Sequence, residues 1–476
     1  MRPRVALLAI AGCVAAGLPL AANAASVAPC QAPAPPPLKF YKPVYVDTNR
    51  AGGEPVTQVA QDGSIILSSH AGTTHIYKDP SAVPGATDFT DDYSNQTLNW
   101  RSTDNGRTWV FTGIAGMPHG PHSATSTGFS DPDLTMDANG TIYNTEIDLA
   151  NVSVYASPDD GKSWPIGNPI AWSGDRPWLT GAGEDTVYLY VNSPKALLVS
   201  SDRGVTWSLV STDFPADGKL IVDPLNRATG LIGPMGEGGA AISPDSGKTW
   251  KAYPLHVESG TQFFGTIAVD RAGWIYVVRA GGYKGASDKK ADGFVVFSYF
   301  NRQTKTWSTP QELKTPHGDA MWPWIIAGDD GRVGVVWLQR DGTKNAFHVY
   351  AAYTLNAHGS KVACRGRTIT APPRWSVTDA SGRSVHNAPI CLSGTACNAA
   401  TDFAAGDRRL GDFLTINIDR TGRLILASAD TRLTNPLGGP KPVSNPIFIG
   451  QLSGARLLRH PDPVRPSRCL FPLTSC

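Results

Sequence analysis

The sequence carries almost no net charge. Its 476 residues include 42 basic and 40 acidic side chains, a formal excess of +2, and two of the basic residues, Arg2 and Arg4, lie at the start of the chain. A strongly basic surface that would bind nucleic acid or an anionic membrane is therefore not expected. After residues 5–20, no apolar run approaches the length of a membrane span, so a transmembrane protein is not expected either.

The sequence motifs of several common enzyme classes are also missing. The seven cysteines show no spacing typical of a zinc site. No glycine-rich loop leads into a helix as in nucleotide-binding proteins, and the Gly-x-Ser-x-Gly motif of serine hydrolases is absent. Glycine and proline are abundant, with 49 and 38 residues, as in chains whose many short strands are joined by turns. This composition favours an all-β fold.

Residues 1–24 resemble a secretory signal peptide. A basic start is followed by an apolar run, and Ala22-Asn23-Ala24 has the small-x-small pattern that predicts cleavage before Ala25. Ile10-Ala11-Gly12-Cys13 offers an alternative, because it resembles a lipobox that would leave a lipid-anchored Cys13. Only seven apolar residues precede Cys13, and the apolar run continues past it, so the first interpretation is favoured. We expect a secreted or periplasmic protein.

Cleavage before Ala25 would leave an even number of cysteines, which in an exported protein suggests up to three disulfides. Short loops favour pairing Cys391 with Cys397 and Cys469 with Cys476. The remaining pair would then be Cys30 with Cys364. Other pairings stay open at this point.

One short phrase occurs four times and has the form Ser-x-Asp-x-Gly-x-(Thr/Ser)-Trp. The four copies span residues 102–109, 157–164, 200–207 and 243–250, and their tryptophans recur at steps of 55, 43 and 43 residues. In each copy the Asp can accept backbone N–H groups inside a tight turn, Gly can adopt a positive φ, and Trp can return to an apolar layer. A period of this length indicates a β-propeller.

The phrase resembles the Asp box, or bacterial neuraminidase repeat, of the sialidase superfamily. The resemblance implies a six- or seven-bladed β-propeller whose boxes lie on outer hairpin turns, away from any active site. The four box carboxylates would then be structural, namely Asp104, Asp159, Asp202 and Asp245. The Asp box is shared by sialidases, other glycoside hydrolases and non-enzymatic receptors, so the resemblance implies the fold more strongly than the activity.

Seven recurring units can be traced, and the fourth of them is weak enough to belong to a neighbour. They begin near residues 54, 131, 175, 218, 263, 322 and 411. We therefore divide the chain into a signal peptide (1–24), a Pro-rich leader (25–39), a β-propeller (40–452) and a C-terminal tail containing Pro and Arg (453–476).

Acidic residues recur where the innermost strand of each unit would begin. Because these strands surround one axis, their first residues converge at one end of the channel. Three of the carboxylates are candidate catalytic groups for glycoside hydrolysis, which uses a carboxyl pair: Asp131, Asp133 and Asp175. Candidate substrate-binding residues on the same rim are Glu54, Arg176, Asp412 and the aromatic residues Trp178, Trp322 and Trp324.

Two other interpretations of these acids remain open. Converging carboxylates could hold Ca²⁺, which prefers six to eight oxygen ligands. Alternatively, Asp-Pro and Glu-Pro pairs are ordinary turn formers whose carboxylates bind local N–H groups. The histidines that fall between predicted strands could serve a channel mouth, although a solvated surface position is favoured for each: His70, His75, His119, His122 and His317.

A sialidase would grip its substrate carboxylate with three arginines, the first in a Phe-Arg-Ile-Pro phrase. The corresponding region here is Gly52-Gly53-Glu54-Pro55, with Glu in place of Arg. Arg176 is then the best candidate for such a grip, and further arginines that could complete the set are Arg279, Arg340, Arg408 and Arg409. The sequence thus predicts a sialidase-like, glycan-active protein, leaning to a glycoside hydrolase. The alternative is a non-catalytic propeller that binds glycan or protein.

Overall fold

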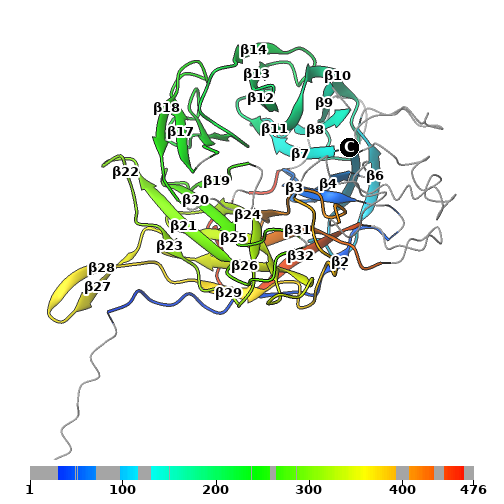
Figure 1. Cartoon of the computed structure of the whole chain (residues 1–476). Helices are drawn as coiled ribbons and strands as arrows, with labels where there is room; N and C mark the ends of the chain where they lie inside the picture. Colours follow the sequence, from blue (N-terminus) through cyan, green and yellow to red (C-terminus); the bar gives the residue numbers. More distant parts are fainter. Residues whose placement is uncertain are drawn as a thin grey trace, which may run out of the picture.

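A computed structural model describes most of the chain and shows a seven-bladed β-propeller (Figure 1). The described residues are 30–48, 50, 52–70, 97–115, 130–148, 151–236, 238–257, 264–285, 287–392, 407–433, 444–461 and 463–465. The expected all-β propeller is confirmed, with seven blades rather than six. The weak fourth unit is a complete blade of its own.

The first four blades each consist of four antiparallel strands in chain order. Blade 1 contains β3 (Gly53–Val59), β4 (Ile65–His70), β5 (Thr97–Ser102) and β6 (Val110–Ile114). Blade 2 contains β7 (Ser130–Met136), β8 (Ile142–Asp148), β9 (Asn151–Ser157) and β10 (Ile166–Ser173). Blade 3 contains β11 (Asp175–Gly181), β12 (Val187–Ser193), β13 (Ala196–Ser200) and β14 (Ser208–Ser211). Blade 4 contains β15 (Ile221–Val222), β16 (Leu231–Pro234), β17 (Gly239–Ser243) and β18 (Lys251–Pro254).

The last three blades carry additions to this plan. Blade 5 contains β19 (Ile267–Val269), β20 (Ile275–Gly281), β21 (Phe294–Asn301), β22 (Thr306–Trp307) and β23 (Gln311–Glu312). Blade 6 contains β24 (Ala320–Ala327), β25 (Val333–Arg340), β26 (Phe347–Thr354) and β29 (Ser376–Asp379). Between β26 and β29, a separate hairpin of β27 (Ser360–Cys364) and β28 (Arg367–Ala371) projects from the ring (Figure 1). Blade 7 contains β30 (Thr415–Ile418), β31 (Leu424–Asp430) and β32 (Asn445–Ser453).

The N-terminal part of the chain completes blade 7 and so closes the ring. Strands β1 (Lys39–Phe40) and β2 (Val44–Tyr45) both pair with β32. Upstream of them, Cys30 forms a disulfide with Cys364 of the projecting hairpin, as the sequence predicted. Such a bond indicates folding outside the reducing cytoplasm. Cys391 is also disulfide-bonded, whereas Cys397, Cys469, Cys476 and residues 1–29 lie outside the described residues.

Each of the four repeated turns is closed by its own Ser and Asp. In blade 2, Asp159 Oδ1 accepts the N–H groups of Lys162 and Ser163, at 3.1 and 3.0 Å, and Oδ2 accepts the Ser163 hydroxyl at 2.6 Å. The buried Ser157 Oγ accepts the N–H of Gly161 at 2.8 Å. The other copies repeat the hydroxyl contacts. All four carboxylates are thus engaged within their own turns.

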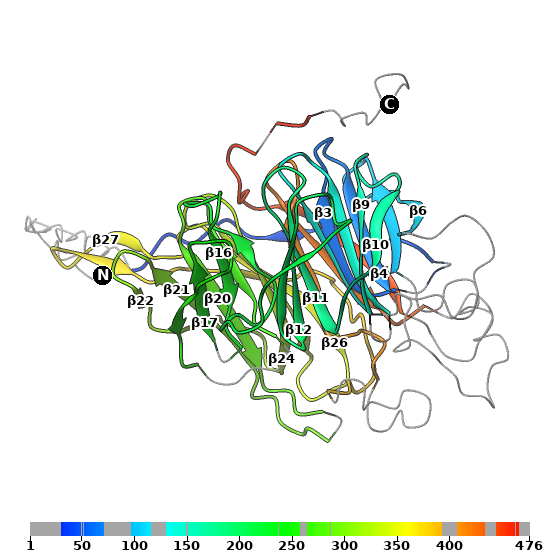
Figure 2. The ribbon, with the colours of Figure 1, turned by 90° about the horizontal axis from the view of Figure 1, so that it is seen from above.

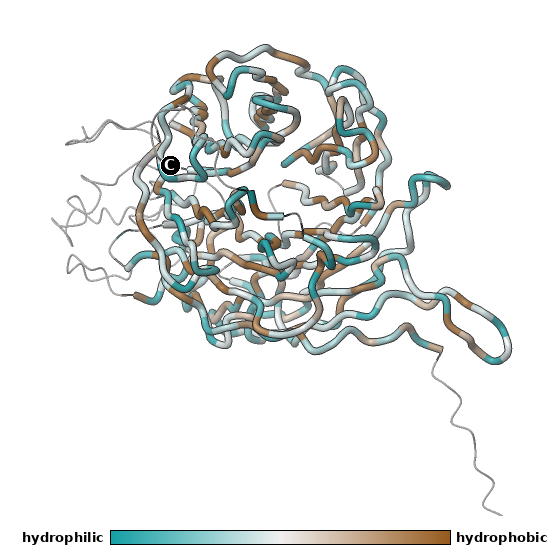
Figure 3. Tube along the Cα trace, turned by 180° about the vertical axis from the view of Figure 1, so that it is seen from behind, coloured by the Kyte–Doolittle hydropathy of each residue, from teal (hydrophilic) through white to brown (hydrophobic). Residues whose placement is uncertain are grey.

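Alternation of strand direction separates the two ends of the propeller. Strands one and three of a blade run in the same direction, so the third-strand turns lie at the end opposite to the first residues of the innermost strands (Figure 2). Hydrophobic stretches run along the strands throughout the ring (Figure 3), and the buried side chains form clusters between adjacent blades. Within the described part of the chain, no helix has the length and apolar character needed to cross a membrane.

Candidate functional site at the channel mouth

Four innermost strands share an unusual backbone feature at the channel mouth. Glu54, Asp131, Arg176 and Trp322 each adopt a positive φ of 50° to 55° and each precedes a proline. In β3, β7 and β24 the strand register shifts at this point, as in a β-bulge. Such conformations cost about 1–3 kcal/mol each in non-glycine residues and cluster at functional sites. These four backbone conformations therefore indicate that the rim is a candidate functional site.

Glu54 is the centre of a buried polar cluster on this rim. Its Oε1 accepts the backbone N–H of Asp412 at 2.7 Å, and its Oε2 accepts that of Asp131 at 3.2 Å. His70 Nε2 lies 3.2 Å from Oε2. Because these partners belong to blades 1, 2 and 7, one carboxylate links three neighbouring blades.

Two arginines from different blades converge on Asp412. Arg176 Nη2 donates to Asp412 Oδ2 at 2.5 Å, and Arg408 Nη1 donates to Oδ1. The Arg176 guanidinium also lies 5.5 Å from the ring centre of Phe264, at cation–π distance. The two arginines thus bind a carboxylate of the protein itself, that of Asp412.

The electrostatics of the cluster separate the pKa values of two neighbouring carboxyl groups. Burial, together with the negative charges of Glu54, Asp175 and Asp412, raises the pKa of Asp131 well above its usual range, although Arg176 opposes this. For Glu54, burial would raise the pKa, but His70, Arg408 and Arg176 outweigh it and lower the pKa. The cluster therefore moves the pKa of Asp131 up and that of Glu54 down.

The other two catalytic candidates differ in their surroundings. Asp133 is 2% exposed and bound by Lys219 Nζ at 2.7 and 2.8 Å, and it accepts the N–H of Leu179 at 2.8 Å. It therefore supports the channel wall. Asp175 is exposed at the start of β11, close enough for its charge to raise the pKa of Asp131. Of the two candidates, Asp175 is thus the one whose charge acts on Asp131.

Four aromatic rings meet on the axis just below the charged rim. Trp178, Phe264, Trp324 and Phe413 come from blades 3, 5, 6 and 7, and every pair of rings lies within 6.0 Å, centre to centre. Beneath this aromatic plug, a cavity of about 220 Å³ is lined by β15, β19, β24 and Lys219. The plug separates the rim from the rest of the channel.

This packing changes the role expected of the tryptophans. Trp178 and Trp322 are 1% and 2% exposed, so their faces are covered by protein and offer no platform for a sugar. Trp322 belongs to the core that joins blades 6 and 7. Trp324 is half-buried in the plug and is the remaining aromatic candidate.

The arginine set expected for a sialidase does not assemble. Arg279 donates to the Gly236 carbonyl, Arg340 pairs with Asp319, and Arg409 pairs with Asp407. Of the five arginines in this set, Arg176 and Arg408 share Asp412 as a partner. Within the same part of the chain, no three His, Cys, Asp or Glu side chains gather as metal ligands do.

His70 is a further member of the cluster at the channel mouth, the less favoured of the two positions that the sequence allowed. It was expected on the solvated surface, but it is fully buried at the end of β4. Antiparallel pairing explains its position, since His70 lies opposite Gly53, one residue before Glu54. Applying that register to the sequence would have placed His70 at the rim.

Comparisons with known proteins find matches at low sequence identity. No family model matches the chain. It is 26% identical over 223 residues to a xyloglucanase from Paenibacillus sp, which covers 40% of this chain and 21% of that protein. The chain thus spans about a fifth of the length of this curated relative.

Solved structures with a similar fold include enzymes and a protein of unknown function. A xyloglucanase from Xanthomonas campestris has a TM-score of 0.45 at 12% identity, covering 85% of this chain and 55% of that one. A Hadza microbial sialidase has a TM-score of 0.39 at 16% identity, covering 62% and 65%. A protein of unknown function from Dyadobacter fermentans has a TM-score of 0.39 at 17% identity, covering 67% and 98%.

Proposed function

We propose that this chain is an exported glycoside hydrolase that cleaves a glycan at the charged rim of its propeller. The observation that carries the proposal is the cluster of carboxyl groups at the rim, where burial and neighbouring negative charge raise the pKa of Asp131 while His70 and two arginines lower the pKa of Glu54. A protonated acid beside an ionised carboxylate is the arrangement that glycoside hydrolysis requires. The Cys30–Cys364 disulfide supports export.

In this mechanism Asp131 is the general acid and the exposed Asp175 is its partner. Asp131 transfers its proton to the glycosidic oxygen, and the bond between that oxygen and the anomeric carbon breaks with its electron pair leaving on the oxygen. Asp175 either attacks the anomeric carbon or removes a proton from an attacking water. Glu54 and Asp412 hold the rim in place, because their carboxylates already bind backbone and arginine groups.

The contacts of Arg176 favour a neutral glycan over a sialoside. A sialoside would bring its own carboxylate, but Arg176 and Arg408 already bind that of Asp412. Glu54 also places a negative charge where the sialidase pattern has an arginine. The similarity to a xyloglucanase supports the same choice. We therefore place neutral β-glucans such as xyloglucan first among candidate substrates.

A second candidate function is glycan binding without hydrolysis. The burial of the rim favours it, since Asp131 is only 5% exposed and Glu54 only 1%. A network that mainly holds blades together would show the same hydrogen bonds. The two functions differ in whether Asp131 transfers a proton.

The test is hydrolysis of a panel that contains xyloglucan, arabinan and a fluorogenic sialoside. We expect turnover of a neutral glycan, reduced at least about 100-fold in Asp131→Asn because a general acid contributes roughly that much. Asp175→Asn should give a comparable loss. Asp213→Asn, an exposed change on the same blade, should keep full activity.

The pH profile separates a catalytic acid from a structural one. Because only protonated Asp131 can act, activity should fall as pH rises through its elevated pKa. If no substrate is cleaved but a glycan still binds, the second candidate function holds. Sialoside turnover that vanishes in Arg176→Ala would instead overturn the preference for neutral glycans.

A further inference from the structure

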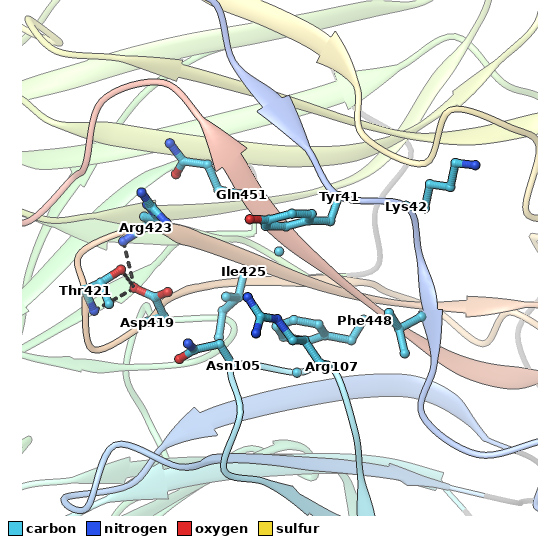
Figure 4. Close-up of a pocket in the computed structure, with 13 residues that line it drawn as sticks. Tyr41, Lys42, Asn105, Arg107, Asp419, Thr421, Arg423, Ile425, Phe448 and Gln451 are labelled. Atoms are coloured by element: carbon cyan, nitrogen blue, oxygen red, sulfur yellow. Dashed lines mark hydrogen bonds between the residues drawn. The ribbon is translucent and has the colours of Figure 1, made fainter.

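A second pocket lies at the opposite end of the propeller, where blade 7 meets blade 1. It has a volume of about 410 Å³ and is lined by the repeated turn of blade 1, by the turn between β30 and β31, and by the segment after β1. Figure 4 shows Tyr41 on one side, Asn105 and Arg107 on the other, and Ile425 and Phe448 between them. This volume lies within the range of small-molecule sites.

The pocket is open because Gly450 of blade 7 stands at a strand position where every other blade has a larger residue. In every blade, one residue of the third main strand pairs with the second residue of the second strand. These residues are Arg101, Ala156, Val199, Ile242, Tyr299, Tyr353 and Gly450. Between blades 1 and 2, the Arg101 side chain fills the junction, donating to Asp160 O at 3.0 Å and to Asp62. Gly450 leaves the corresponding space open.

The walls of this pocket combine an aromatic face with positive charge. The Tyr41 ring is 49% exposed, whereas Phe448 is only 2% exposed and forms an apolar floor held by Trp109, 5.4 Å away between ring centres. Across the described residues, no carboxylate pairs with the guanidinium of Arg107 or Arg423. These two cations are therefore available to an anionic ligand.

The one carboxylate that lines the pocket is tied to its own turn. Asp419 Oδ1 accepts the N–H groups of Thr421 and Arg423, at 2.7 and 2.9 Å, and the Thr421 hydroxyl at 2.7 Å. Lys42 points away from the centre (Figure 4). Because the pocket has two arginines and a single carboxylate that is already hydrogen-bonded, its net charge is positive. The side-chain amide of Asn105 adds a donor and an acceptor.

We propose that this pocket binds a small carboxylate that carries a ring. The ring would lie against Tyr41 above the Phe448 floor, and the carboxylate would pair with Arg107 and Arg423. A sugar acid and an aromatic acid share this chemistry. The site is independent of the proposed hydrolase, because it lies at the other end of the propeller and shares no lining residue with the charged rim.

The test is calorimetric titration with D-glucuronate and with 4-hydroxybenzoate, using glucose and phenol as neutral counterparts. We expect at least one acid to bind and its neutral counterpart to bind at least about tenfold more weakly. Whichever acid binds identifies the source of the ligand. If neither acid binds, or if the neutral compounds bind equally well, the proposal is wrong.

Two variants locate the binding in this pocket. Gly450→Val fills it with the residue that blade 3 has at this position, and a Cβ there makes ordinary contacts of 3.5 Å with Phe448 and 3.9 Å with Tyr41. It should abolish binding while the thermal unfolding midpoint changes little. Arg423→Gln should weaken binding about tenfold without filling space, and the exposed Arg227→Gln should have no effect. Binding that survives both pocket variants would overturn the proposal.

Discussion

Glu54 illustrates how a single buried carboxylate can determine the state of its neighbours. It sits in blade 1, accepts N–H groups from blades 2 and 7, and contributes the negative charge that helps raise the pKa of Asp131. Because it is fully buried, its charge must be balanced locally. His70, Arg176 and Arg408 supply that balance. The same residue therefore affects both the stability of the ring and the protonation of the proposed acid.

Glu54→Gln should destabilise the protein by about 3–5 kcal/mol, the usual cost of removing one partner from a buried charged network. One oxygen would become an amide that faces an N–H donor. The folded-state pKa of Glu54 is lowered to about 2 from 4.5, so its contribution is present above the unfolded value and is lost as pH falls through the folded value. Denaturant titrations of both proteins between pH 7 and 3 measure the difference.

That difference should shrink as the pH falls, because the wild type loses the contribution that the variant already lacks. The exposed Glu184→Gln is the matched control and should leave stability unchanged. A constant difference across this pH range would contradict the assigned ionisation of Glu54.

At the scale of the element, the repeated turn shows why part of this fold could be read from the sequence. All the hydrogen bonds of the turn join residues within a few positions of one another, so the eight-residue phrase is enough to specify the turn. The positions of the innermost strands followed from the repeat. The aromatic plug did not, because Trp178 and Trp324 could be placed near the axis but the burial of their faces depends on Phe264 and Phe413 from other blades.

Within one turn, two serines should differ in their effect on stability. Ser157→Ala leaves the buried N–H of Gly161 without its acceptor, which costs about 1–3 kcal/mol. Ser163→Ala removes an exposed hydroxyl that donates to Asp159 and should cost no more than about 0.5 kcal/mol. Thermal or urea unfolding of the two variants compares them directly. Equal losses would mean that the serine in the first position does not close the turn.

At the scale of the whole molecule, closure of the ring was the part that sequence reasoning missed. The propeller was predicted to begin at residue 40, but the sequence did not indicate that its first strands pair with its last, as Lys39 and Phe40 do with Ser453 and Gln451. Pairing between segments so far apart in the chain produces no local sequence pattern from which it could be predicted. The number of blades was bracketed correctly, since seven recurring units could be traced although the repeated turn occurs in four of them, and His70 was favoured as a surface residue rather than as part of the rim.

The disulfide should hold the N-terminal segment against blade 6. Cys30 and Cys364 are separated by 334 residues in sequence, and removing such a native bond typically costs about 2–4 kcal/mol. The double variant Cys30→Ser/Cys364→Ser should therefore unfold at a lower temperature than the wild type, and reductant should lower the wild-type midpoint more than that of the variant. An unchanged midpoint would show that strand pairing alone holds the segment.

The pairing of β1 and β2 with β32 also means that closure of the ring must be a late step in folding. A chain synthesised from its N-terminus presents these two strands first and their partner almost last, on the order of tens of seconds apart at ordinary rates of synthesis. During that interval the first six blades can form, but the ring is open and its free edges are exposed. The nascent protein is therefore most vulnerable to aggregation and proteolysis just before its last strand emerges.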